Sequence, residues 1–231
     1  MYIKYIIILI NIFNIMLFGC STRPNITIPQ QPYSSIKQTK KTNNTKNIIN
    51  LNKLNETCSN IECEQQLQLD LIYYYYNNTD LKQAQQIANQ FLHSYPNNHN
   101  LDYVYYIKGL INLSLDKNQN NMLHKLFNIH LSQYNPTYAY AAMHDLSHIT
   151  KTYPTSQYYT KANEHIFYLE NRITEYELNV IKFYYKKKAY TTVINRAQNI
   201  LNSFPNTPSA HQALTYLNKA YQKLNLIKNK K

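Results

Sequence analysis

The sequence of 231 residues contains only two glycines, Gly19 and Gly109, and no tryptophan. Phosphate-binding loops, nucleophile elbows and tight hairpin turns all depend on the backbone freedom of glycine. The scarcity of glycine therefore argues against nucleotide-binding loops, against hydrolases built on a nucleophile elbow and against hairpin-rich β folds.

Acidic residues are also few, with 12 Asp and Glu against 24 Lys and Arg, which gives a formal net charge of +12. A positive balance of this size is found in many proteins that bind nucleic acid. Most lysines, however, are scattered over the polar faces of expected helices, with clusters only at 186–188 and in the tail at 228–231. No nucleic-acid-binding motif accompanies them. We therefore interpret the lysines as solvated helix faces and expect no nucleic-acid partner.

What the chain does contain is one pattern that occurs three times, at 81–97, 140–155 and 189–206. Each copy carries apolar residues at spacings of four, three and four, and ends in an aromatic residue followed by proline. These spacings place one apolar stripe on one face of a helix, and the proline ends that helix. The stripe residues are, copy by copy, Ala84, Ala88, Phe91 and Tyr95; Ala142, Leu146, Ile149 and Tyr153; and Val193, Ala197, Ile200 and Phe204.

Each copy can bury its stripe only against neighbouring helices, as happens in a helical solenoid. Small residues at the first stripe positions and the closing aromatic–proline pair are typical of tetratricopeptide units. We predict an all-α, tetratricopeptide-like helical-hairpin solenoid of about four to five repeats, the first degenerate and the last truncated. It occupies residues 48–226 and is followed by a basic tail, 227–231.

Between and beyond the copies, apolar periodicity predicts four further helices. Asp80 and Asn135 stand where N-caps are expected, with Gln83 as the reciprocal partner of Asp80. Gly109 lies inside a predicted helix, where glycine costs up to about 1 kcal/mol relative to alanine, so we expect close helix packing there. Many of the 24 tyrosines are expected to fill core positions with their hydroxyls reaching water. The four predicted helices are 64–77, 100–115, 156–187 and 208–226.

The chain begins with a lysine-containing start and a run of about 14 apolar residues that Gly19 and Cys20 close. A membrane-spanning helix needs about 20 such residues. The pattern therefore indicates a lipoprotein signal peptide, 1–19, whose removal leaves Cys20 for lipidation. Because Ser21 rather than Asp follows the cysteine, we expect an anchor in the outer membrane facing the periplasm. Residues 20–47, rich in Pro, Gln, Asn and Thr, are expected to form a lipidated flexible tether.

Two further cysteines, Cys58 and Cys63, lie close together in the sequence. In an oxidising compartment such a pair can form a disulfide that closes the turn before the next helix. The disulfide and two free cysteines remain equal alternatives at this stage. A zinc site is not expected, because no other cysteine or histidine lies near enough in sequence to complete four ligands.

One arrangement invites a test for catalysis, since His144 and His148 are four residues apart with Asp145 between them. Two histidines at this spacing can share a metal on one face of a helix. The acid is one methylene shorter than the Glu of metalloprotease helices, and the pattern supplies no third ligand. We therefore interpret both histidines as surface residues and predict no metal, no cofactor and no catalytic residue. The alternative, a zinc peptidase, requires stoichiometric metal.

A set of short segments, with their order and separations, carries a further signal across roughly residues 64–222. The segments are 67–73, 101–104, 109–110, 153–158, Leu169, Arg172, 176–177 and 193–196, with an insertion at 116–134. Together with the lipoprotein signal they resemble one family, the BamD (YfiO) lipoproteins of the outer-membrane β-barrel assembly machine.

This resemblance implies a non-enzymatic scaffold of about five tetratricopeptide repeats on the periplasmic face of the outer membrane. Its C-terminal half would bind the last POTRA domain of a BamA-like barrel-forming subunit, with Arg196 and its neighbour Asn195 at the contact. Its N-terminal half would receive the C-terminal targeting sequences of unfolded β-barrel proteins. Lipoproteins similar to BamC or BamE are implied as further partners.

Three features depart from the family's pattern. The stretch from Cys58 to Cys63 replaces an aromatic, Gly/Pro-containing turn, residues 130–134 replace the charged part of the insertion, and the chain ends before the family's final helix. The alternative is a different tetratricopeptide lipoprotein, in pilus assembly or cell-wall coordination, which would lack the POTRA interface.

Overall fold

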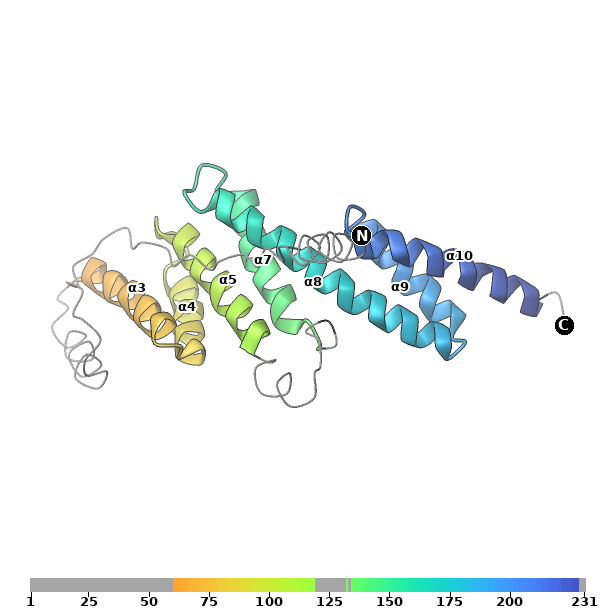
Figure 1. The fold of residues 1–231 in the computed structure, drawn as a ribbon. Helices are drawn as coiled ribbons and strands as arrows, with labels where there is room; N and C mark the ends of the chain where they lie inside the picture. The colour runs from red at the N-terminus through yellow and green to blue at the C-terminus, as the bar shows by residue number, and fades with distance from the viewer. Residues whose placement is uncertain (1–59, 119–131, 133, 229–231) are drawn as a thin grey trace, which may run out of the picture.

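The structure, a computed structural model, describes residues 60–118, 132 and 134–228, which form seven α-helices and no strand. The helices stand one after another in a row, from α3 at one end to α10 at the other (Figure 1). The all-α solenoid prediction is therefore confirmed, whereas the number of repeats stays a prediction. The expected signal peptide, the tether and residues 48–59 at the start of the predicted repeat domain lie outside the described residues.

The predicted helices are all found, with their ends shifted by at most three residues. The three sequence copies form α4, α7 and α9, and each of these helices ends two residues before its proline. The bounds are α3 (Ile61–Asn77), α4 (Leu81–Ser94), α5 (Leu101–Asn118), α7 (Thr137–Thr152), α8 (Tyr159–Lys186), α9 (Tyr190–Ser203) and α10 (Pro208–Lys228).

The predicted N-caps are only partly correct. The Asp80 carboxylate accepts from the Gln83 backbone N–H at 3.3 Å, as predicted, but the Asp80 N–H donates to the Tyr75 carbonyl instead of meeting the Gln83 side chain. At α7 the predicted cap is wrong, because Pro136 occupies the cap position without a side-chain bond. The Asn135 side chain accepts from the hydroxyl of Thr137 at 2.8 Å, which turns it away from the helix backbone.

The repeated stripe makes the core. All nine inner stripe positions of the three copies are buried. The closing aromatic residues, Tyr95, Tyr153 and Phe204, each donate their backbone N–H to the carbonyl four residues earlier, and their side chains pack against the same apolar cluster. The aromatic–proline pair thus ends each helix and also covers the core beside it.

The buried apolar residues form two clusters. The first cluster runs from Leu69 to Ile173, and the second from Leu178 to Ala220. Helix α8 contributes to both, with Leu169 and Ile173 in the first and Leu178 and Ile181 in the second. One continuous helix therefore connects the two clusters, and α9 and α10 pack against its second half.

Close packing at Gly109 is found where it was expected, between α5 and α7. A Cβ atom added at Gly109 would lie 2.7 Å from Cγ and Cδ2 of Leu146, well inside ordinary carbon–carbon contact.

The expectation that tyrosine hydroxyls reach water is wrong at Tyr103, which is 1% exposed. Its hydroxyl has no hydrogen-bond partner in the described part of the chain, and burial raises the pKa of Tyr103.

His165 on α8 gives the fold a dependence on pH. The residue is 1% exposed, and neither ring nitrogen has a hydrogen-bond partner among the described residues. Burial lowers the pKa of His165, Lys117 and Lys161 lower it further, and Glu164 opposes the shift. Below about pH 6.5 the unfolded chain therefore binds a proton at this imidazole that the folded chain does not bind.

We expect the free energy of unfolding to fall as the pH drops below about 6.5, by up to about 1.4 kcal/mol per pH unit from this group. Urea unfolding between about pH 5 and pH 7.5 measures this slope. His165→Phe removes the buried imidazole and is expected to flatten the slope, whereas His144→Gln, at an exposed position, is the control. Equal slopes in the wild type and in His165→Phe would contradict the assignment.

Candidate partner-binding site

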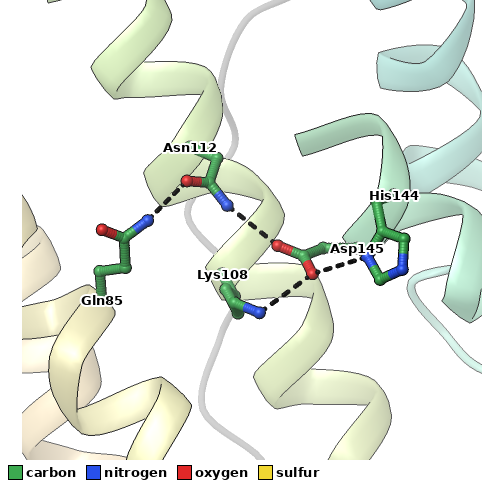
Figure 2. A network of polar contacts seen from close by, with 5 residues as sticks. All are labelled: Gln85, Lys108, Asn112, His144 and Asp145. Atoms are coloured by element: carbon green, nitrogen blue, oxygen red, sulfur yellow. Dashed lines mark hydrogen bonds and ion pairs between the residues drawn. The ribbon is translucent and has the colours of Figure 1, made fainter. Parts of the chain in front are cut away.

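A buried polar network holds α4, α5 and α7 in place (Figure 2). The Asp145 carboxylate on α7, 3% exposed, accepts from Asn112 Nδ2 at 2.9 Å and pairs with Lys108 Nζ at 3.2 Å. Asn112 in turn accepts from Gln85 Nε2 of α4 at 2.7 Å. His144, whose side chain is 81% exposed, reaches the same carboxylate at 3.4 Å. Because these bonds have defined directions, they fix how α7 is rotated against α5.

A second buried polar contact attaches α8 to α5. Arg172 Nε donates to Asp116 Oδ2 at 3.1 Å, and Nη2 approaches Oδ1 at 3.4 Å. Nη2 also donates to the Tyr134 carbonyl at 3.0 Å, which attaches the segment before α7. Burial raises the pKa of Asp116, and the positive charge of Arg172 opposes that shift. The two contacts together position the helices that carry the predicted site.

The predicted contact residue, Arg196, lies on the surface where α9 packs against α8. Its Nη1 donates to Glu177 Oε2 at 2.7 Å, and its guanidinium lies 5.7 Å from the centroid of the Tyr184 ring. The side chain is 37% exposed and that of Glu177 is 20% exposed. A guanidinium carries five N–H donors in one plane, so an arginine held in this way still offers donors to a partner's carboxylate.

Two more residues complete this surface. Asn195 is exposed beside Arg196, and Tyr140 on α7 is 41% exposed. Burial raises the pKa of Tyr140 first, the negative charge of Glu177 raises it further, and Arg196 lowers it. We call the set of Tyr140, Glu177, Tyr184, Asn195 and Arg196 the Arg196 surface. It combines charge, hydrogen-bonding groups and aromatic area from three successive helices.

The sequence alone missed most of the Arg196 surface. In the sequence, Glu177 stood out only as part of a segment that resembles the family, and Tyr140 and Tyr184 were not distinguished from other tyrosines. Their meeting depends on how α7, α8 and α9 pack, and no residue spacing encodes that packing. Only the family resemblance singled out Arg196.

The other residues that the sequence singled out are three cysteines and two histidines. Cys20 and Cys58 lie outside the described residues; Cys63 is disulfide-bonded, and its pairing with Cys58 stays a proposal. The ring of His148 lies tilted against that of Tyr105, with ring centroids 4.1 Å apart. Among the residues that the structure describes, no three His, Cys, Asp or Glu side chains are grouped to hold a metal.

Comparison with known proteins gives the family. A family model described as "YfiO: Outer membrane lipoprotein" matches residues 28–231. The chain belongs to the YfiO family. The resemblance recognised in the sequence is therefore confirmed over most of its length.

Several curated relatives carry the name "Outer membrane protein assembly factor BamD". The relative from Buchnera aphidicola is 38% identical over 175 residues, covering 76% of this chain and 70% of its own. The relative from Vibrio cholerae is 33% identical over 216 residues, covering 91% and 88%. The relative from Pasteurella multocida is 33% identical over 162 residues, covering 70% and 61%.

Proposed function

We propose that this protein is a non-enzymatic scaffold of the machinery that assembles β-barrel proteins in the outer membrane. The observation that carries the proposal is its membership of the YfiO family over residues 28–231, with relatives named as assembly factors for outer membrane proteins. A lipid on Cys20 would hold it at the periplasmic face. No described helix has the length and apolar character to cross a membrane.

Within this function, the Arg196 surface is proposed to bind the POTRA region of a BamA-like barrel protein. The pairing of Arg196 with Glu177 at 2.7 Å supports this, because a side chain already held in place loses less conformational entropy on binding. A planar guanidinium also matches a carboxylate through two parallel bonds. Unfolded β-barrel proteins are the proposed clients, and BamC-like or BamE-like lipoproteins are proposed further partners.

The N-terminal half is proposed to receive the client. A shallow hollow lies between the start of α3 and the turn after α4, lined by Gln65, Tyr95, Asn98 and neighbouring residues. Asn98 Nδ2 donates to Gln65 Oε1 at 2.8 Å, and the amide N–H groups that this bond leaves over can bond to the backbone of an extended segment. The tyrosine offers apolar area. Client and barrel protein would then bind at separate places along the same row of helices.

Arg196→Asp tests the proposed interface. The change places a new carboxylate against Glu177 and repels an acidic partner, so we expect the amount of captured POTRA-containing barrel protein to fall at least about tenfold. The measurement is affinity purification of the full lipoprotein from mildly solubilised envelopes, followed by quantitative mass spectrometry. Lys161→Asp is the matched control, because it makes the same change of charge at an exposed pair with Glu164 on the first turn of α8.

The outcomes separate the interface from the function. Equal capture by Arg196→Asp and Lys161→Asp would reject the Arg196 surface while keeping the scaffold. Recovery of pilus or cell-wall proteins, with no barrel protein from either form, would reject the assembly function and favour the alternative lipoprotein role. Circular dichroism of both variants verifies that the helices are intact.

A further inference from the structure

Charge is distributed unevenly along the row of helices. Residues 60–177 contain 11 Asp and Glu and seven Lys and Arg, whereas residues 178–231 contain ten Lys and Arg and no Asp or Glu. The last acidic residue in the chain, Glu177, is already paired with Arg196. The end of the row formed by α9, α10 and the second half of α8 is therefore its positive end.

The turn between α8 and α9 brings three of these lysines together. Lys186 ends α8, Lys187 is its cap, and Lys188 follows with a φ of 60°. All three are exposed. Beside them Phe183 is 54% exposed, and Lys187 Nζ lies 5.8 Å from the centroid of its ring. A large apolar side chain is thus presented to solvent next to a group of positive charges.

Helix α10 adds two more lysines to the same end. The ring of Tyr185 on α8 lies against those of Tyr190 on α9 and Tyr216 on α10, with centroids 5.7 and 5.4 Å apart. These contacts place the middle of α10 beside the α8–α9 turn. Lys219 and Lys223 follow Tyr216 at exposed positions. We call Phe183 together with Lys186, Lys187, Lys188, Lys219 and Lys223 the basic tip.

We propose that the basic tip binds the anionic phospholipid headgroups of a membrane surface. Its positive charges are all lysines, which act as point charges without a preferred bonding geometry, whereas protein interfaces favour arginine and are depleted in lysine. Lysines beside an exposed aromatic residue are the combination that attracts a chain to an anionic bilayer and settles it at the headgroup level. The tip would give the protein a second membrane contact besides the lipid anchor of the proposed function.

Vesicle binding tests the proposal with the anchor-free chain beginning at Ser21, which keeps every described residue. The vesicles contain phosphatidylcholine alone or with about 30 mol % phosphatidylglycerol, and sedimentation gives the partition coefficient. Each lysine near an anionic surface strengthens binding roughly fivefold. The triple variant Lys186→Gln, Lys187→Gln, Lys188→Gln is therefore expected to bind anionic vesicles about a hundredfold more weakly.

The matched control is the triple variant Lys82→Gln, Lys151→Gln, Lys161→Gln. It has the same net charge and changes exposed lysines on α4, α7 and the first turn of α8. Its binding is expected to stay within about threefold of the wild type, because these lysines lie outside the basic tip and exposed charges are screened beyond a Debye length of about 10 Å. Thermal unfolding followed by circular dichroism verifies that both variants are folded.

The proposal predicts binding to the anionic vesicles only, reversed at about 0.5 M salt, and lost in the tip variant alone. Three results would overturn it: no binding to anionic vesicles, equal binding to neutral vesicles, or equal weakening in both triple variants. If the wild type did not bind vesicles, and affinity purification from solubilised envelopes showed that the tip variant had lost an acidic protein, the basic tip would be a protein-binding surface. Because the assay contains no barrel protein, its failure would leave the proposed function untouched.

Discussion

Replacing Arg172 with methionine is expected to lower the free energy of unfolding by about 3–5 kcal/mol. Its side chain is 3% exposed and that of Asp116 is 0% exposed, so the substitution leaves a carboxylate buried without its partner. It also removes the donor to the Tyr134 carbonyl. The loss will be limited where Asp116 can take up a proton, because burial already raises its pKa. Urea unfolding near neutral pH measures the effect.

The double variant Arg172→Met, Asp116→Leu provides the control for this prediction. Replacing both members of a buried ion pair by apolar residues of similar size is often neutral or stabilising. Arg172 Nη1 has no partner among the described residues, so the native pair is incompletely satisfied. We therefore expect the double variant to recover most of the lost stability. A single variant that loses less than about 1 kcal/mol would show that the pair does not anchor α8.

Asp145→Ala is expected to lower the free energy of unfolding by about 3 kcal/mol. The substitution leaves the amide of Asn112, which is 1% exposed, without its acceptor, and it leaves Lys108 without a counter-charge. Each buried group left unpaired costs about 1–3 kcal/mol. Urea unfolding of the variant gives the change, and its midpoint should move without a large change in slope.

His144→Ala is the matched control for the network, because it removes another member of the same set of bonds (Figure 2). His144 is 81% exposed in its side chain whereas Asp145 is 3% exposed. An exposed contact of this kind is worth at most about 1 kcal/mol, so little change is expected. Similar losses of stability in Asp145→Ala and His144→Ala would mean that the burial of Asp145 does not determine its contribution to the free energy of unfolding.

The fold could be predicted from the sequence because the repeated stripe is a local pattern. Ala88, Leu146 and Ala197 each lie eight residues before their proline, and all three are buried. Each proline ends its helix whatever packs against that helix. The helix ends were predicted least well. At α7, for example, the Asn135 side chain bonds to Thr137, and this contact competes with capping.

The polar contacts could not be predicted, because a buried polar residue in a helix has the same sequence pattern as an exposed one. Asp145 lies between two histidines in the sequence and looked like part of a surface group. In the structure it points at α5 and bonds to Asn112, 33 residues earlier. Arg172 and Asp116 are 56 residues apart. Such pairings follow from the packing of whole helices, which no local spacing reports.

The length of α8 carries a consequence for how the sequence of this chain can vary. The helix has 28 residues and contributes to both apolar clusters, with Ile173 in the first and Leu178 in the second. One residue inserted or deleted between them would rotate α9 and α10 by about 100° around the helix axis. The Arg196 surface would then lose Tyr140, which stands on α7. A substitution in this short stretch alters one side chain, whereas a change in its length displaces two helices.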